Sequence, residues 1–236
     1  MDTTFGNSYG QSVAESSAEA RASFIRKTYA HLALAIFAFA VLSIGLQMSP
    51  LAGAISATML GGRFSWFIVL AVFMGVSSLA TWWANSQTSP AMQYVGLILY
   101  VVAEAVIFLP LMFIASRTVG PSVFVTAGGL TLFLFVALSA VVLLTKKDFS
   151  FLKPILAIGG IVSLGFIVVS LIFGFSLGGL FSLAMVVFAA GSILYNTSNV
   201  LHTYNTNQHV AASLTLFAGI ALMFWYILRI FMGSRN

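Results

Sequence analysis

Long apolar runs alternate with short polar breaks along most of the chain. Each run is close to the roughly 20 residues that a helix needs to cross the hydrocarbon core of a bilayer. Strands of a membrane barrel would instead show about ten residues of alternating polarity. We therefore predict an all-α integral membrane protein with seven transmembrane helices, over 29–48, 64–84, 94–115, 121–144, 154–174, 177–198 and 209–233.

Composition agrees with this pattern. Of 236 residues, 60% are hydrophobic and only 6% are charged, far outside the range of soluble domains. Residues 1–28 are polar, rich in Ser and Ala, and lack the apolar core of a cleaved signal peptide. We predict a polar cytoplasmic N-terminal tail over 1–28 and one transmembrane domain over 29–236, embedded in the lipid bilayer.

The Lys and Arg residues that flank the predicted spans indicate an orientation. Cytoplasmic loops carry an excess of these residues. With the N-terminus inside, six lie on the inner side and four on the outer side: Arg21, Arg26, Lys27, Lys146, Lys147 and Lys153 against Arg63, Arg117, Arg229 and Arg235. We expect the N-terminus in and the C-terminus out. The basic residues form no stripe on one face, so no nucleic-acid partner is expected.

Catalytic and metal-binding motifs are missing from the sequence. It contains no phosphate-binding loop, no dinucleotide fingerprint after a strand, no His-Glu-x-x-His pair and no cysteine. His31, His202 and His209 do not share one helical face, which favours interfacial residues over a metal site. We therefore expect neither an enzyme nor a cofactor.

One acidic residue lies in the middle of an apolar stretch, "LYVVAEAVIFLP" over 99–110. Glu104 is about 15 Å from either end of its predicted span. A carboxylate facing lipid at this depth would cost a few kcal/mol or more. We expect the side chain to face the bundle, to point toward the fourth or seventh span and to hydrogen-bond a donor there. The possible partners are Arg63, Arg117 and Arg229 and the hydroxyls of Tyr100 and Thr131. Two interpretations stay open: a neutral acid that fixes helix packing, and a cation site.

Two further stretches carry a signature. "LLTKKDFSFLKP" over 143–154 contains Lys146, Lys147 and Asp148, and "ILYNTSNVLH" over 193–202 places Thr-Ser-Asn shortly after a tyrosine. Together with the seven spans and the polar tail, these stretches resemble the Bax inhibitor-1 family, particularly its bacterial YccA-like branch, over about residues 20 to 231. Glu104, six residues before Pro110, matches the family as well.

The resemblance implies a fold and a polar site. Six helices in two groups of three would surround a central C-terminal helix at 209–233. The candidate intramembrane polar residues are Glu104, Tyr195, Asn196, Asn199 and Arg229.

One departure from the family concerns pH. Members that act as pH-sensitive calcium leaks carry an Asp on the sixth helix and another on the seventh, close enough to share a proton. The matching positions here are Asn196 and Gly219, or Ala218 in the neighbouring register. None of these residues titrates, and a coupled pair responds to pH only when both members do. Any transport would therefore work without that switch.

Three functions remain as hypotheses. The preferred one is a non-enzymatic regulator in the bacterial inner membrane that contacts an FtsH-type membrane protease through the tail, as the YccA-like branch implies. The second is a calcium or proton leak lined by Glu104 and Asn196. The third is a structural subunit of a larger membrane complex.

Overall fold

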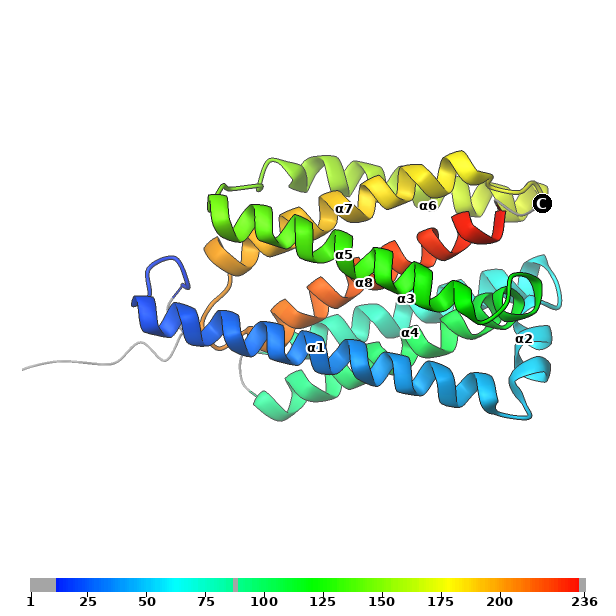
Figure 1. Ribbon diagram of the computed structural model, residues 1–236, viewed down its shortest axis with the longest axis horizontal. Helices are drawn as coiled ribbons and strands as arrows, with labels where there is room; N and C mark the ends of the chain where they lie inside the picture. The colour runs from blue at the N-terminus through cyan, green and yellow to red at the C-terminus, as the bar shows by residue number, and fades with distance from the viewer. Residues whose placement is uncertain (1–11, 87–88, 234–236) are drawn as a thin grey trace, which may run out of the picture.

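The computed structural model describes residues 12–86 and 89–233, and the regular elements in these residues are helices (Figure 1). Seven of them are long and apolar enough to cross a membrane, which confirms the predicted fold class. The helices are α1 (Ala18–Met48), α2 (Ala52–Leu60), α3 (Arg63–Ala84), α4 (Pro90–Thr118), α5 (Ser122–Thr145), α6 (Leu152–Phe173), α7 (Gly179–His202) and α8 (His209–Gly233).

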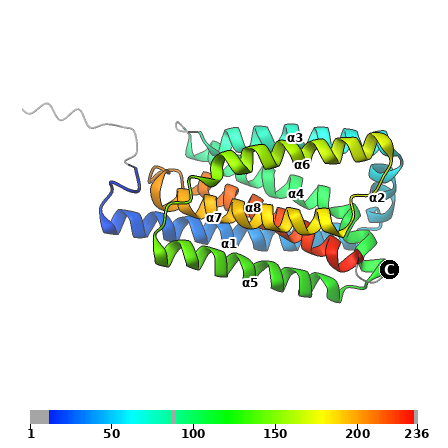
Figure 2. The ribbon, with the colours of Figure 1, turned by 90° about the horizontal axis from the view of Figure 1, so that it is seen from above.

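Helix α8 is the centre of the bundle, as the resemblance implied. In its most apolar stretch 72% of the residues are buried, against 6% in α3 and in α6. It contacts α1, α3, α4, α5 and α7. The outer helices form two groups of three, because α1 and α3 pack on α4 while α5 and α6 pack on α7 (Figures 1 and 2).

Aromatic side chains fill the contact between α1, α4 and α8. Phe39 of α1 meets Phe108 of α4 edge-on at 5.1 Å between ring centroids, and Phe217 of α8 at 5.8 Å. Such pairs contribute about 0.5–1.5 kcal/mol beyond their buried area. Small residues such as Ala212 and Gly219 let the other faces of α8 approach neighbouring helices closely.

The first helix is longer than its predicted span. It begins at Ala18 rather than at residue 29, and the Ser17 hydroxyl accepts the Ala20 N–H at 3.2 Å. Serine is a favoured N-cap because its oxygen satisfies a free amide of the first turn. The second half of the predicted tail is therefore helical.

Residues 12–17 fold back onto the bundle. The Val13 amide donates to the Tyr204 carbonyl at 2.9 Å, and the Arg21 side chain donates to the Val13 carbonyl at 3.1 Å. Val13 is fully buried. Of the predicted tail, residues 1–11 lie outside the described part of the chain.

The short helix α2 has no counterpart among the predicted elements. It lies between the first two spans and crosses the end of the bundle opposite the start of α1 (Figure 1). Nine residues are too few to cross a membrane. Ala52 and Ser56 are buried, and Gly53 lies against the ring of Phe113 on α4.

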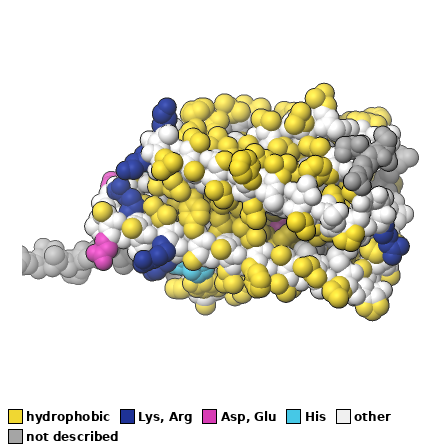
Figure 3. Space-filling model, in the orientation of Figure 1, with side chains coloured by type: hydrophobic (Ala, Val, Ile, Leu, Met, Phe, Trp, Pro, Cys, Tyr) yellow, Lys and Arg dark blue, Asp and Glu magenta, His cyan; other side chains and the backbone are white. Residues whose placement is uncertain are grey.

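The two ends of the bundle differ in charge. We call the end at which α1 begins the amino end and the other the far end. Figure 3 shows basic side chains gathered at the amino end, with a smaller group at the far end. Helix α8 ends at the far end, as seven crossings require.

Helices α3 and α4 cross most closely at Gly96. A Cβ atom at this position would lie 2.5 Å from both the Ala80 carbonyl oxygen and the Ala84 nitrogen. Both contacts are backbone atoms, which cannot rotate away. Gly128 on α5, in contrast, has open space around its Cα.

We expect Gly96→Ala to lower the free energy of unfolding by about 1–3 kcal/mol, because the added methyl group has to push α3 and α4 apart. Gly128→Ala is the matched control and should be neutral or slightly stabilising. Thermal unfolding of both variants in one detergent measures the difference. Equal melting temperatures would contradict the close crossing.

Candidate functional site

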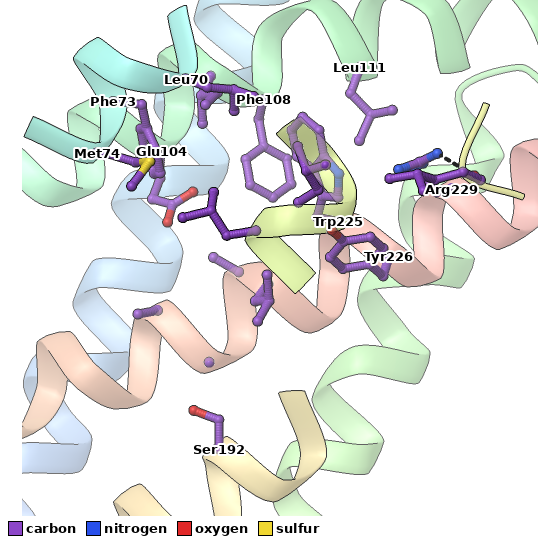
Figure 4. Close-up of a pocket in the computed structure, with 18 of the residues that line it drawn as sticks. Leu70, Phe73, Met74, Glu104, Phe108, Leu111, Ser192, Trp225, Tyr226 and Arg229 are labelled. Carbon is purple, nitrogen blue, oxygen red and sulfur yellow. Dashed lines mark hydrogen bonds between the residues drawn. The ribbon is translucent and has the colours of Figure 1, made fainter. Parts of the chain in front are cut away.

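A cavity of about 750 Å³ lies inside the bundle, between α3, α4, α6, α7 and α8 (Figure 4). Most of its wall is apolar, with Phe108 of α4 and Trp225 of α8 near its middle. Its polar residues come from both helix groups and from α8. The volume is within the range of sites that bind small molecules.

Glu104 lies in the wall of this cavity. Only 6% of its surface is exposed, and Figure 4 shows the carboxyl group pointing from α4 into the cavity. Its side-chain hydrogen-bond partner is the hydroxyl of Tyr100, one turn earlier on the same helix. The side chain therefore faces the bundle as predicted. Of the possible partners, the structure gives Tyr100 of α4 itself, so the expectation of a donor on the fourth or seventh span is wrong.

Asn196 and Gly219 face the cavity from α7 and α8. The Asn196 amide donates to the Ser192 hydroxyl at 3.2 Å and to the Thr215 carbonyl at 3.3 Å, which joins the two helices. A Cβ atom at Gly219 would lie 3.1 Å from Ile193. The two positions that we expect to match the family's acidic pair thus lie on neighbouring helices of one wall.

Arg229 lines the cavity toward the far end. Its guanidinium donates to the Leu177 carbonyl at 3.0 Å and lies 5.9 Å from the Tyr226 ring centroid (Figure 4). Across the described ranges 12–86 and 89–233, the structure records no ion pair for this side chain. A half-buried cation therefore has only a carbonyl oxygen and an aromatic face as neighbours.

The other predicted polar residues lie outside the cavity wall. Tyr195 and Asn199 are half-buried on α7, and Asn199 accepts a hydrogen bond from the Thr203 hydroxyl at 3.3 Å. Lys146 and Lys147 are exposed at the amino end, where Lys146 ends α5 in a left-handed conformation. The structure thus brings together only Glu104, Asn196 and Arg229 of the five candidates.

Asp148 and Ser198 connect the two sequence motifs. The carboxylate accepts the Ser150 amide at 2.8 Å and the Ser150 hydroxyl at 2.9 Å, and the Ser198 hydroxyl donates to it at 3.3 Å. Ser198 also accepts the Phe149 amide at 3.0 Å. The backbone hydrogen bond from Ser150 and then its hydroxyl hold the pKa of Asp148 below its usual value. The α5–α6 loop is therefore docked on the end of α7.

Sequence reasoning did not single out the polar face of α3. Ser77, Ser78, Thr81 and Asn85 bound a second, more open cavity of about 570 Å³, which shares Thr81 and Tyr100 with the first. The buried Ser77 hydroxyl has no hydrogen-bond partner. Spacing of three to four residues puts these side chains on one helical face, a signal that the sequence does contain.

The histidines form a pair at the amino end. The rings of His31 and His209 lie 4.9 Å apart, and His31 Nε2 lies 3.1 Å from the Tyr94 hydroxyl. His202 is separate and donates from Nδ1 to the Ser198 carbonyl at 2.9 Å. No cluster of three or more potential metal ligands occurs in 12–86 and 89–233.

A central apolar helix within two groups of three, with a mostly apolar cavity beside it, defines a polytopic helical membrane protein. The family model described as "Inhibitor of apoptosis-promoting Bax1" matches residues 21–236. The chain therefore belongs to the Bax inhibitor-1 family.

Relatives occur in bacteria and in yeast. An uncharacterized protein of Pseudomonas aeruginosa is 32% identical over 199 residues, covering 82% of this chain and 86% of the relative. Bax inhibitor 1 of Schizosaccharomyces pombe is 30% identical over 241 residues, covering 95% and 81%. An uncharacterized membrane protein of Vibrio cholerae is 32% identical over 126 residues, covering 52% and 55%.

We expect Ser150→Ala to raise the pKa of Asp148 more than Ser198→Ala does. The reason is that the hydrogen bond from the Ser150 hydroxyl lowers this pKa more than the one from the Ser198 hydroxyl does. The loop contacts should persist at neutral pH and weaken only as the pH falls through the lowered pKa, since a protonated carboxyl accepts hydrogen bonds less well. Carboxyl ¹³C NMR with labelled aspartate measures this directly, because the chain has only Asp2 and Asp148. Asp2→Asn assigns the signals, and an Asp148 pKa at or above its ordinary value would contradict the docked loop.

Proposed function

We propose that this protein is a leak pathway for cations, protons above all, and that Glu104 is the site at which the ion binds. The observation that carries the proposal is the placement of a buried carboxyl group, near the middle of a membrane span, in the wall of a cavity between the helices. Ionisable residues at this depth commonly mark ion or proton pathways. The family assignment by itself establishes a membrane protein, and the proposal adds an activity to it.

The charge of the site favours a proton over calcium. Among the described residues, Glu104 is the only acid within the central part of a span, because Glu15 and Glu19 lie just before and at the start of α1 and Asp148 lies in the loop between α5 and α6. Calcium takes about six to eight oxygen ligands, usually with several carboxylates. One carboxyl group with hydroxyl and amide neighbours neutralises one proton fully and one calcium ion only in part.

A polar route toward the amino end supports the proposal. From Glu104 it continues through the hydroxyls of Tyr100 and Thr81 into the second cavity, which Ser77 and Asn85 line. In the other direction the positive charge of Arg229 opposes the passage of cations. Conduction therefore requires a change in the position or the neighbours of Arg229 at the far end.

The other two hypotheses stay predictions. Contact with an FtsH-type protease was expected through the tail, of which residues 12–17 pack on the bundle and residues 1–11 lie outside the described part. A structural role in a larger complex would use the lipid-facing surfaces of α3 and α6. Neither hypothesis requires a carboxyl group in the cavity, so a Glu104 variant separates them from a leak.

We expect Glu104→Gln to reduce proton flux about tenfold or more, because the amide keeps the hydrogen bond to Tyr100 but cannot exchange a proton at neutral pH. The measurement is dye-reported acidification of liposomes that contain the purified protein. Glu19→Gln makes the same chemical change at the amino end and should leave the flux unaltered. Calcium flux is recorded in parallel to identify the ion.

A second variant tests the structural alternative. Glu104→Leu leaves the Tyr100 hydroxyl without its partner and should lower the free energy of unfolding by about 1–3 kcal/mol, whereas Glu104→Gln should not. If Glu104→Gln keeps full flux, the leak proposal is wrong and Glu104 serves helix packing.

We expect the amino end to face the bacterial cytoplasm and the C-terminus to face the opposite side of the inner membrane, because six of ten Lys and Arg residues flank the spans on the amino side. Reporter fusions at residues 1 and 236, active in only one compartment, measure the orientation. A cytoplasmic signal from both ends would mean that one of the seven spans does not cross.

A further inference from the structure

Among residues 12–86 and 89–233, the structure records no counter-ion for Arg229, which lines a largely apolar cavity. Its guanidinium carries five N–H donors, and the structure records a single hydrogen bond from it, to the Leu177 carbonyl. The described acids that lie at the amino end are far away, and Glu104 is at the other end of the cavity (Figure 4). Most of the hydrogen-bonding capacity of this side chain is therefore available to a ligand.

The distance between Arg229 and Glu104 follows from the packing of α4 on α8. Tyr100 meets Phe217 at 6.1 Å between ring centroids, and Phe108 meets Trp225 at 4.9 Å. Glu104, halfway between these contacts on α4, is level with about residue 221 of α8. Eight residues of helix separate that level from Arg229, which is about 12 Å at 1.5 Å per residue.

The wall between these two residues is mostly apolar. Leu111 and Phe108 lie on one side, Trp225 on a second and Leu70 on a third. Trp66 stacks on Trp225 at 6.4 Å and closes the wall near Arg229. A ligand that matches both the Arg229 guanidinium and the apolar wall has an anionic head and a hydrocarbon tail.

We propose that the cavity binds one long-chain carboxylate, a fatty acid, with its head on Arg229 and its tail running toward Glu104. Arginine binds carboxylates through two parallel N–H···O bonds, which suits an exposed guanidinium fork. A cavity of about 750 Å³ suits one chain, whereas a two-chain phospholipid presents twice the tail.

The bilayer itself is the source of such a ligand. Helices α3 and α6, which both line the cavity, are the long helices with the smallest buried share, at 6% each. They lie side by side on one face of the bundle (Figure 2). A single chain can enter between them from the hydrocarbon core without crossing water. A bound tail would also displace water beside Glu104 and so reduce proton flux, a consequence that rests on the proposed function.

Tryptophan fluorescence tests the binding directly. The chain has four Trp residues, and Trp82→Phe with Trp83→Phe leaves only Trp66 and Trp225, both in the cavity wall. The protein is placed in phosphatidylcholine nanodiscs and titrated with stearic acid that carries two bromine atoms at mid-chain, which quench nearby indoles. We expect saturable quenching. The brominated methyl ester, which lacks the charge, should quench only in proportion to its amount in the bilayer.

Variants at the far end identify the head-group site. Arg229→Gln should weaken the saturable quenching about tenfold or more, because it removes the charge-assisted hydrogen bonds. Arg117→Gln is the matched control: Arg117 is exposed at the same end and packs over Phe113, outside the cavity wall, so binding should not change. Glu104→Gln should leave fatty-acid binding within about twofold even where it abolishes flux, which separates this proposal from the leak.

Three outcomes would overturn the proposal. They are quenching that does not saturate, an ester that binds as well as the acid, and an Arg229→Gln variant with unchanged binding. Brominated phosphatidylglycerol that competes as well as the fatty acid would replace the single-chain ligand with a two-chain lipid. If Arg229→Gln fails to fold, the comparison of acid with ester on the unaltered arginine still decides.

Discussion

The hydrocarbon core of a bilayer offers no hydrogen-bond partners, and the arrangement of this protein depends on that constraint. Backbone groups satisfy one another within seven helices. Polar side chains at depth turn toward the bundle, where Asn196 bonds Ser192 and the backbone of α8, and Glu104 bonds Tyr100. Exposed positions on α3 and α6 are almost all apolar. At the depth of the hydrocarbon core, polar side chains therefore find their hydrogen-bond partners in the interior of the bundle.

The central position of α8 explains why the interior is not filled. Helices α1, α4, α5 and α7 pack directly on α8, with aromatic pairs on one side and small residues on another. Helix α6 packs mainly on α7 and α3. Space remains between α3, α6 and α8, and side chains of five helices line it as one cavity.

An acidic and a basic residue lie at the two ends of that cavity. Glu104 and Arg229 are separated by about 12 Å of apolar wall, which is too far for an ion pair. Each group therefore needs its own partner, a proton or cation on one side and an anion on the other. One cavity can serve both as a proton leak and as a binding site for an amphiphile. A ligand bound at Arg229 would control how much water reaches Glu104.

The sequence alone determined the elements and the depth of the key acid. Bilayer thickness sets the length of an apolar run, so the seven spans could be counted, and the lone Glu104 had to face inward because lipid cannot solvate it. The sequence did not predict that α1 begins at Ala18 or that α2 exists, since short or partly polar helices lack a membrane-length signal.

Only the tertiary structure decided which polar residues meet. Asn196 and Arg229 reach the cavity with Glu104, whereas Tyr195 and Asn199 do not, although all were equal candidates in the sequence. Ser198 joins its motif to the other through Phe149 and Asp148, which lie 49 and 50 residues before it. The physical reason is that a helix apolar on nearly every side has no preferred face in its own sequence. Its rotation is set by contacts such as the close crossing at Gly96, which exist only once the helices pack.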